Sequence, residues 1–148
     1  MNSKSYIELE KNIYHEEVST KEHFAHLYKL LESRKHFISH KKMPNYEEHM
    51  EFCKNNPYRL WFIVFQRDIV IGSFYITHDN CIGLNLKEDN LEIYKILIQY
   101  IVTNIEPLPP VPSLVPKNFY CNIPPSNKNL LEAAEALGGH ITQFSVQF

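Results

Sequence analysis

Three strand-like segments in the middle of the chain, separated by very short turns, constrain the fold more than any other feature. The first, Leu60 to Gln66, is rich in aromatic and β-branched residues, and only Arg67-Asp68 separates it from the second, Ile69 to Thr77. A turn at His78-Asp79-Asn80 leads into the third, Cys81 to Leu86. Such short connections leave no room for a crossover, so neighbouring segments must run antiparallel. The sequence therefore predicts an antiparallel meander.

Capping residues and helical periodicity predict two helices before this meander. Ser19 and Glu22 have the spacing of a capping box, and an apolar stripe at helical spacing follows them. A first helix is expected at about residues 20 to 33. Asn45 and Glu48 repeat the start pattern, and Asn56-Pro57 ends the segment. The second helix is therefore expected to be the shorter one.

Alternating helices and strands are predicted after the meander. A wide apolar face indicates a long helix that begins after Asp89 or Asn90. With a period-two pattern around Ile7 and Leu9, the chain reads β-α-α-β-β-β-α-β-α-β. This order predicts one α+β domain over residues 1–148, with a mixed sheet, helices on both faces, and parallel strands flanking the long helix. The remaining elements are a strand at Asn118 to Ile123, a helix at Leu130 to Leu137 and a final strand at Ile141 to Gln147.

Composition excludes several classes of protein. The net charge of −2 and the pI of about 6.4 provide no electrostatic basis for a nucleic-acid partner. Three widely spaced cysteines, Cys53, Cys81 and Cys121, without a CxxC pair, argue against a disulfide scaffold and fit a reducing cytosol. The dense apolar run at 60–65 is far shorter than the roughly 20 residues that span a bilayer. We expect a cytoplasmic protein with no membrane partner; its oligomeric state stays open.

The stretch "NIPPSNKNLLEAAEALGG" resembles the closing part of the GNAT superfamily of N-acetyltransferases. Members often end with a strand, an Asn-Pro-x-Asn-like turn, a helix and a Gly-Phe pair before the last strand. Asn122, Pro124, Asn127, Leu137 and Gly138 fit that pattern. The order of elements over most of the chain is also similar to this family. Further similar stretches are Ser39 to Val64, which leads from the second helix into a strand, and Ile71-Gly72-Ser73 on the following strand.

The resemblance implies a substrate pair and a binding gap. In the family, acetyl-CoA lies in a V-shaped gap between the third meander strand and the strand after the long helix, and its pantetheine arm pairs like an added strand. The N-terminus of the long helix binds the pyrophosphate. The acceptor would be a small amine, and the segment 39–64 is similar to members that acetylate amino sugars. The implied cofactor-binding residues are Leu84, Asn85, Leu86, Lys87, Asn90, Asn122 and Asn127.

The positions that the resemblance implies for catalysis depart from the family pattern. The family tyrosine that protonates the leaving thiolate would fall on Ala134, and the Phe of the Gly-Phe pair on Gly139. Tyr120, on the strand before the last helix, is the candidate substitute for that acid. His78 and Asp79, at the meander turn, are candidate bases. Glu47, Glu48 and His49 on the second helix are further candidates, and the acceptor contacts are expected within His40 to Tyr46.

The expected pyrophosphate loop is absent, which opens a second hypothesis. The family's Arg/Gln-x-x-Gly-x-Gly/Ala loop corresponds here to "LKEDNLEIYK", which contains no glycine. Glu88 and Asp89 suit a helix N-terminus but would repel a pyrophosphate. The alternative function is therefore a degenerate fold that no longer binds acyl-CoA and serves as a ligand- or protein-binding module. The proline-rich stretch 106–116 is a candidate partner segment or, alternatively, a stiff loop within the domain.

The histidines and Cys121 could serve in a metal site or as a nucleophile, or could be ordinary surface and core residues. A zinc site needs three or four convergent ligands, and no histidine motif with a placed carboxylate occurs. We therefore expect no metal. Cys121, between Tyr120 and Asn122, is a candidate nucleophile or a small core residue. The histidines considered are His23 and His26 on the first helix and His36 and His40 after it.

Overall fold

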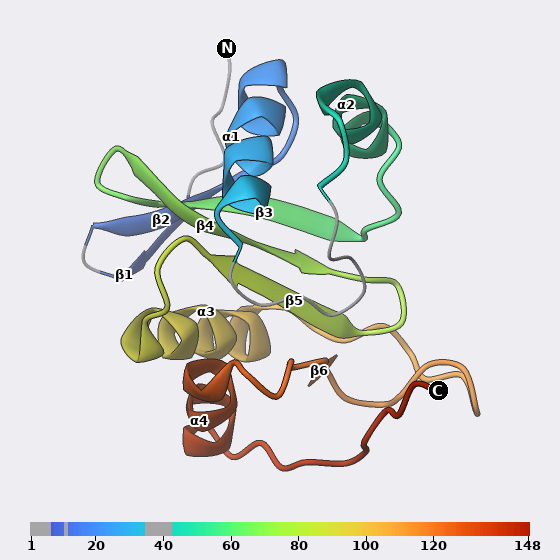
Figure 1. Cartoon of the computed structure of the whole chain (residues 1–148). Helices are drawn as coiled ribbons and strands as arrows, with labels where there is room; N and C mark the ends of the chain where they lie inside the picture. The colour runs from blue at the N-terminus through green and yellow to red at the C-terminus, as the bar shows by residue number, and fades with distance from the viewer. Residues whose placement is uncertain (1–6, 11, 35–42) are drawn as a thin grey trace.

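The computed structural model describes residues 7–10, 12–34 and 43–148, and within them it forms one twisted sheet with helices on both faces (Figure 1). Neighbouring strands follow the chain order, and all pairs are antiparallel except the last, β5 with β6. The strands are β1 (Ile7–Glu10), β2 (Ile13–Glu17), β3 (Leu60–Gln66), β4 (Ile69–Ile76), β5 (Cys81–Leu86) and β6 (Tyr120–Cys121). The helices are α1 (Lys21–Glu32), α2 (Tyr46–Lys54), α3 (Leu91–Asn104) and α4 (Lys128–Ala136). The predicted fold class, a mixed α+β sheet with parallel strands flanking the long helix, is confirmed.

The helices begin where the sequence places side-chain caps. Asn45 accepts a hydrogen bond from the Glu48 amide at 2.8 Å, and Asn90 accepts one from the Ile93 amide at 3.1 Å. At α1 the cap is Thr20, one residue after the expected Ser19, and the ring of His23 completes the capping box. Capping side chains satisfy amide groups that have no partner inside the helix, which fixes the start of each helix.

The first hairpin differs from the prediction, because the chain forms two strands before α1 where the sequence indicated one. β2 pairs with β3 over five residues and joins the hairpin to the meander. The turn before it uses Asn12 in the left-handed region, with φ of 62°. Ile13 and His15 are both buried, so buried and more exposed side chains do alternate along β2. Because one of the buried residues is a polar histidine, the alternation of apolar and polar residues is not visible in the sequence.

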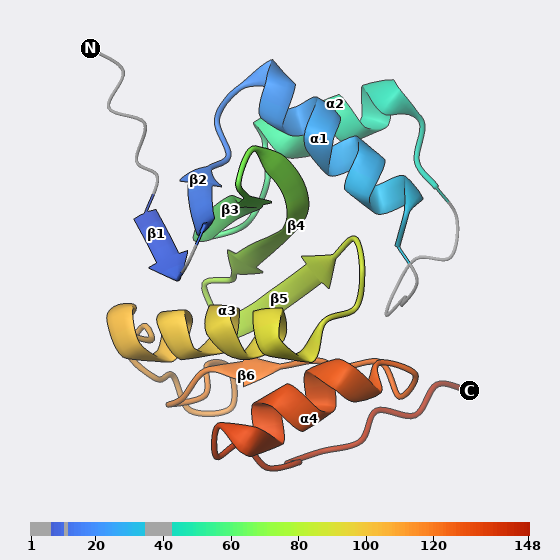
Figure 2. The same cartoon turned by 90° about the vertical axis from the view of Figure 1, so that its left-hand side faces the viewer.

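Two clusters of buried side chains hold the helices on opposite faces of the sheet (Figure 2). On one face, α1 and α2 bury Leu27 and Cys53 against Ile63 of β3. On the other, α3 buries Leu97 and Ile101 against the inward side chains of β4 and β5, and α4 packs against α3. None of the described helices is both long and apolar enough to cross a membrane.

The proline-rich stretch 106–116 is fixed to the sheet by one buried residue. Asn80, in the turn between β4 and β5, has a φ of 70° and no exposed surface. Its side-chain amide donates to the carbonyl oxygens of Leu108 at 2.9 Å and Pro116 at 3.0 Å, and its oxygen accepts from the Leu108 amide at 2.7 Å. These contacts support the stiff-loop alternative for the stretch, since both of its ends are tied to the same turn.

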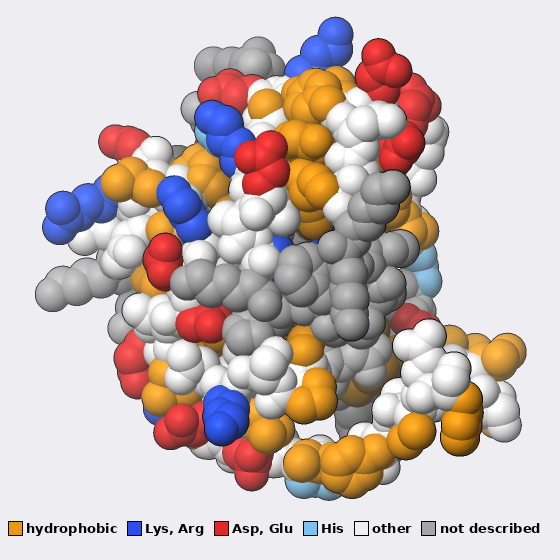
Figure 3. Space-filling view, in the orientation of Figure 1, with side chains coloured by type: hydrophobic (Ala, Val, Ile, Leu, Met, Phe, Trp, Pro, Cys, Tyr) orange, Lys and Arg blue, Asp and Glu red, His pale blue; other side chains and the backbone are white. Residues whose placement is uncertain are grey.

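The expected last two strands are the main corrections. The strand predicted at Asn118 to Ile123 is only two residues long, and the final strand predicted at Ile141 to Gln147 does not form. Gly138, with φ of 92°, turns the chain outward after α4. The segment then runs outside β6 (Figure 1). Hydrophobic side chains line the lower edge of the molecule in the same orientation (Figure 3). Alternation alone does not make a strand, because β6 offers only a very short edge to pair with.

His15 is buried in an aromatic environment without hydrogen-bond partners for its ring. It is 1% exposed, and its ring centroid lies 4.4 Å from that of Phe62, 5.5 Å from Phe74 and 5.0 Å from Tyr100. Neither ring nitrogen has a partner. Burial lowers the pKa of His15 from 6.5 to about 4, so the imidazole is neutral in the folded chain at neutral pH.

This burial predicts a loss of stability in mild acid. The unfolded chain binds a proton near pH 6.5 and the folded chain only near pH 4, so the contribution of His15 is present above pH 6.5 and is lost as the pH falls towards 4. Between pH 7.5 and 4.5 the wild-type chain should lose about 2 to 3 kcal/mol more unfolding free energy than His15→Leu. Urea unfolding at both pH values measures it, and equal losses in the two chains would contradict it.

Candidate functional site

A cavity opens where β5 and β6 separate. The two strands pair only at Cys81 with Tyr120 and at Ile82 with Cys121. From Gly83 to Leu86, β5 is paired with β4 on one side, and no described strand occupies its other edge. The cavity beside this edge has a volume of about 300 Å³. It is lined by Arg34, Ser73, Tyr75, Cys81, Ile82, Gly83, Leu84, Asn85, Leu86, Asp89, Tyr94, Asn122, Pro124, Asn127 and Leu130.

The residues that follow β6 explain why its pairing with β5 stops. Two prolines, Pro124 and Pro125, follow shortly after β6, and proline has no N–H to donate to a strand ladder. The backbone N–H of Asn127 then donates to the Pro124 carbonyl oxygen at 2.9 Å, and this turn leads the chain into α4. The chain therefore leaves the sheet while β5 continues, and the space between them becomes the cavity.

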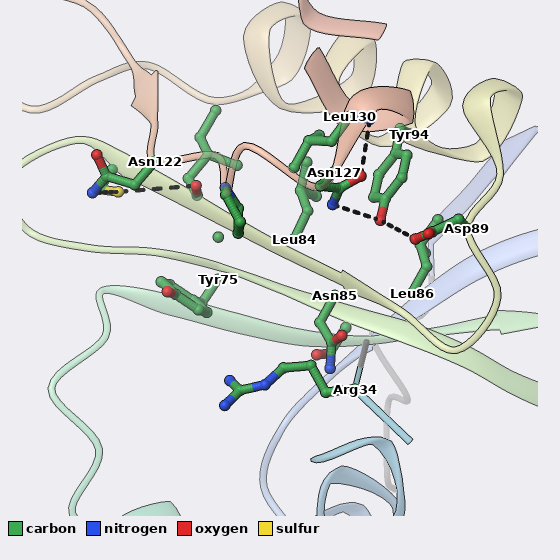
Figure 4. Close-up of a pocket in the computed structure, with 15 residues that line it drawn as sticks. Arg34, Tyr75, Leu84, Asn85, Leu86, Asp89, Tyr94, Asn122, Asn127 and Leu130 are labelled. Atoms are coloured by element: carbon green, nitrogen blue, oxygen red, sulfur yellow. Dashed lines mark hydrogen bonds between the residues drawn. The ribbon is translucent and has the colours of Figure 1, made fainter. Parts of the chain in front are cut away.

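One wall of the cavity is a chain of hydrogen bonds between three side chains, drawn in Figure 4. The side-chain amide of Asn127 donates to the Tyr94 hydroxyl at 3.2 Å, and that hydroxyl donates to the Asp89 carboxylate at 3.1 Å. The oxygen of Asn127 also accepts from the Leu130 amide at 3.2 Å and so caps α4. Burial raises the pKa of Tyr94 to about 12, so the phenol stays protonated. These bonds join the starts of α3 and α4 at the cavity.

The start of α3 has a capping side chain on one of its amide groups and a carboxylate in the preceding residue. Asn90 caps the helix, and the carboxylate of the preceding Asp89 lies at the cavity wall. A helix N-terminus favours an anion, but here a carboxylate of the chain itself is placed beside it. An incoming pyrophosphate would meet this negative charge.

The opposite wall is aromatic. The ring of Tyr75 lies directly over Gly83, where an added Cβ would come within 2.0 Å of it. Tyr58 stacks on Tyr75 with ring centroids 4.0 Å apart and an angle of 7°, and Trp61 meets Tyr58 edge-on at 5.0 Å. Burial raises the pKa of both tyrosines, so both are neutral. Gly83 is therefore required for the ring of Tyr75 to rest flat on β5.

The implied cofactor-binding residues divide into two groups. Leu84, Asn85, Leu86, Asn122 and Asn127 all line the cavity. Lys87 and Asn90 are not among its lining residues, and Asn90 is engaged as the cap of α3. Sequence reading missed Arg34, Tyr75 and Tyr94.

The residues implied as catalytic gather outside the cavity lining. The Tyr120 hydroxyl donates to Asp79 at 2.7 Å, and Thr77 donates to the same carboxylate. The hydrogen bonds from Thr77 and Tyr120 lower the pKa of Asp79, and burial together with Asp79 raises that of Tyr120. His78 is exposed on the same turn. The structure brings these three residues to one turn, and their catalytic role stays a prediction.

Other candidates from the sequence have structural contacts. The His49 ring is buried and contacts the Phe24 carbonyl oxygen at 2.8 Å, whereas Glu47 and Glu48 are exposed. Burial raises the pKa of Cys121 to about 12, which disfavours the nucleophilic thiolate. Among the described residues, no group of three or more His, Cys, Asp or Glu side chains could hold a metal ion. His36, His40 and the start of the expected acceptor segment 40–46 lie outside the described residues.

The packing of Tyr75 on Gly83 generates a stability prediction. Gly83→Ala should lower the unfolding free energy by about 1 to 3 kcal/mol, because the new methyl group displaces the ring. It should also change the emission of Trp61, the single tryptophan, through Tyr58.

Denaturant unfolding followed by tryptophan fluorescence measures both effects. The matched control is Gly83→Ala in a Tyr75→Ala background, where the clash is gone. There the methyl group should cost much less, and an equal cost in the two backgrounds would refute the packing argument.

Comparisons with known proteins support the fold. Neither a scan of protein-family models nor a search of curated proteins finds a match to this chain. Among solved structures, the chain is similar to RimL, a ribosomal L7/L12 alpha-N-protein acetyltransferase in complex with coenzyme A. The TM-score is 0.51 at 12% sequence identity, and the match covers 66% of this chain and 67% of that one. The chain therefore has a GNAT-like fold.

Proposed function

We propose that this chain is a GNAT-type N-acetyltransferase that moves an acetyl group from acetyl-CoA to a small amine, with an amino sugar as the leading acceptor. The observation that carries the proposal is the edge of β5 from Gly83 to Leu86, which borders a cavity of about 300 Å³. A backbone edge without a strand partner can take an extended ligand as an added strand. The pantetheine arm, which carries amide groups, suits such an edge. The coenzyme A complex of the similar structure, RimL, supports this choice of donor.

The proposed reaction is a direct transfer. The amine nitrogen attacks the thioester carbonyl carbon, the new C–N bond forms, and the C–S bond breaks to release the thiolate of CoA. One proton leaves the amine nitrogen, and one joins the sulfur. Leu84, Asn85 and Leu86 would border the arm on one side, with Asn122 and Asn127 on the other.

We keep Tyr120, Asp79 and His78 as the proposed path for the proton. Tyr120 pairs in register with Cys81, which lines the cavity, and the Tyr120 hydroxyl donates to Asp79. His78 precedes Asp79 in the chain and is exposed, so it would pass the proton to solvent. The raised pKa of Tyr120 makes it a weak acid, so its expected contribution is a hydrogen bond to the sulfur, for which its O–H must turn from Asp79 towards the cavity.

One observation favours the second candidate function, a binding module that no longer uses acyl-CoA. Asp89 sits at the start of α3, where the pyrophosphate of a donor would lie, and Tyr94 holds it in place. If this carboxylate excludes the nucleotide part altogether, the cavity would take another small ligand. Donor binding therefore separates the two functions.

The first prediction of the proposed function concerns the donor. Calorimetry with acetyl-CoA should show binding, and acetyl-pantetheine should bind within about tenfold of it, because the wall at α3 gives the nucleotide part little help. Donor binding must be accompanied by acetyl transfer to glucosamine, detected by mass spectrometry. If neither donor binds at millimolar concentration, the N-acetyltransferase proposal fails and the binding-module function stands.

The second prediction isolates the carboxylate at α3. Asp89→Asn should tighten acetyl-CoA binding about threefold to tenfold, because one negative charge near the pyrophosphate is removed. It should leave acetyl-pantetheine unchanged. Glu135→Gln, an exposed carboxylate near the end of α4, is the matched control and should change neither affinity. Equal effects of Asp89→Asn on both donors would show that the residue acts only through local structure.

A further inference from the structure

The cavity has one positively and one negatively charged side chain among its described lining residues, and they lie apart. Arg34 follows the end of α1, whereas Asp89 precedes α3 on the opposite side of the sheet. Figure 4 shows the Arg34 side chain extending below Tyr75, while the Asp89 carboxylate is turned towards Tyr94. The two charged groups therefore do not pair with each other, and we call the α1 and α2 side of the cavity, where Arg34 lies, its cationic end.

The cationic end is built on a rigid base. Tyr75 rests on Gly83 and stacks against Tyr58, and both phenols are neutral. The Arg34 side chain is partly buried near these rings, and this burial lowers its pKa. A guanidinium stays protonated in proteins, and its planar set of N–H groups matches a carboxylate or phosphate with two parallel hydrogen bonds. The guanidinium has five N–H donors, so it can bind an oxyanion in addition to the contacts it already makes.

Neutral polar groups extend this end towards the sheet edge. Ser73 of β4 and Asn85 of β5 are partners in register, so both side chains lie on the same face as Tyr75. Ser73 is 7% exposed, which places its hydroxyl inside the cavity wall. A hydroxyl and an amide can orient ligand hydroxyl groups but carry no charge. This side of the cavity therefore offers uncharged hydrogen-bonding groups beside Arg34 to a small polar molecule.

We infer that the acceptor is a small primary amine that also carries an oxyanion, a carboxylate or a phosphate, and that Arg34 binds this oxyanion. With the anion at Arg34, the molecule would extend past Tyr75 and Ser73 towards the edge of β5. Its amine would then approach the donor thioester there. This inference rests on the proposed function, because it names the acceptor class of the same site.

Three amino sugars that differ in one group test the inference. Glucosamine carries no anion, muramic acid adds a carboxylate, and glucosamine 6-phosphate adds a phosphate. Calorimetry with the whole chain, with and without CoA, measures the binding of each one. At least one anionic sugar should bind ten times more tightly than glucosamine or better. The sugar that binds more tightly identifies the oxyanion as a carboxylate or a phosphate.

Substitutions at Arg34 show whether this side chain is responsible. Arg34→Gln should remove the preference for the anionic sugar, and Arg34→Lys should retain part of it, because a point charge replaces a planar donor. Arg59→Gln is the matched control, since Arg59 donates to the Glu106 carbonyl and is not a lining residue of the cavity. Thermal unfolding should show that all three variants fold.

The outcomes separate this inference from the proposed function. Equal binding of the three sugars, or a preference that persists in Arg34→Gln, would overturn the inference even if acetyl-CoA binds and glucosamine is acetylated. Failure to bind any of the sugars would also overturn it. Conversely, a preference that depends on Arg34 would support the oxyanion site even if acetyl-CoA does not bind, in which case only the transfer reaction would be lost.

Discussion

The short backbone pairing between β5 and β6 is the interaction on which the cavity depends. Two residue pairs fix β6 parallel to β5 and so attach α4 and the wall that it carries. The pairing stops there because Pro124 and Pro125 follow, and proline contributes no N–H to a ladder. A longer β6 would cover the edge from Gly83 to Leu86, and the cavity would close. The same prolines therefore both end the sheet and create the site.

The wall at the start of α3 decides what part of a donor the chain could recognise. In a helix N-terminus that binds phosphate, backbone amides and the helix dipole act together on an anion. Here Asn90 engages one amide and Asp89 adds a negative charge, while Tyr94, which accepts a hydrogen bond from Asn127, donates to that carboxylate. What remains for a donor is the backbone edge of β5. Such an edge recognises an amide-bearing arm and is indifferent to a nucleotide beyond it.

Features that depend on neighbouring residues in the chain could be predicted from the sequence. The residues that the fold brings together at the cavity could not. Turn lengths fixed the meander, and capping side chains such as Asn45 and Asn90 fixed helix starts, because both effects act within a few residues. The strand expected at 141–147 failed because a strand needs a partner edge, which its own residues do not reveal. Tyr94 read as part of an apolar helix face, although its hydroxyl is a polar member of the cavity wall. Arg34 had no local signal, since only the fold brings it beside Tyr75.

The separation of charge in the cavity bears on how a bound amine could lose its proton. A free amine is protonated in water, and it must lose a proton before it attacks a thioester. Burial and the nearby guanidinium of Arg34 both disfavour a second positive charge, so both lower the pKa of a bound amine. An oxyanion on the same molecule offsets the charge of Arg34 while leaving the effect of burial. The cavity would then generate the neutral amine mainly by desolvation, and an exposed group such as His78 would only need to pass the proton to solvent.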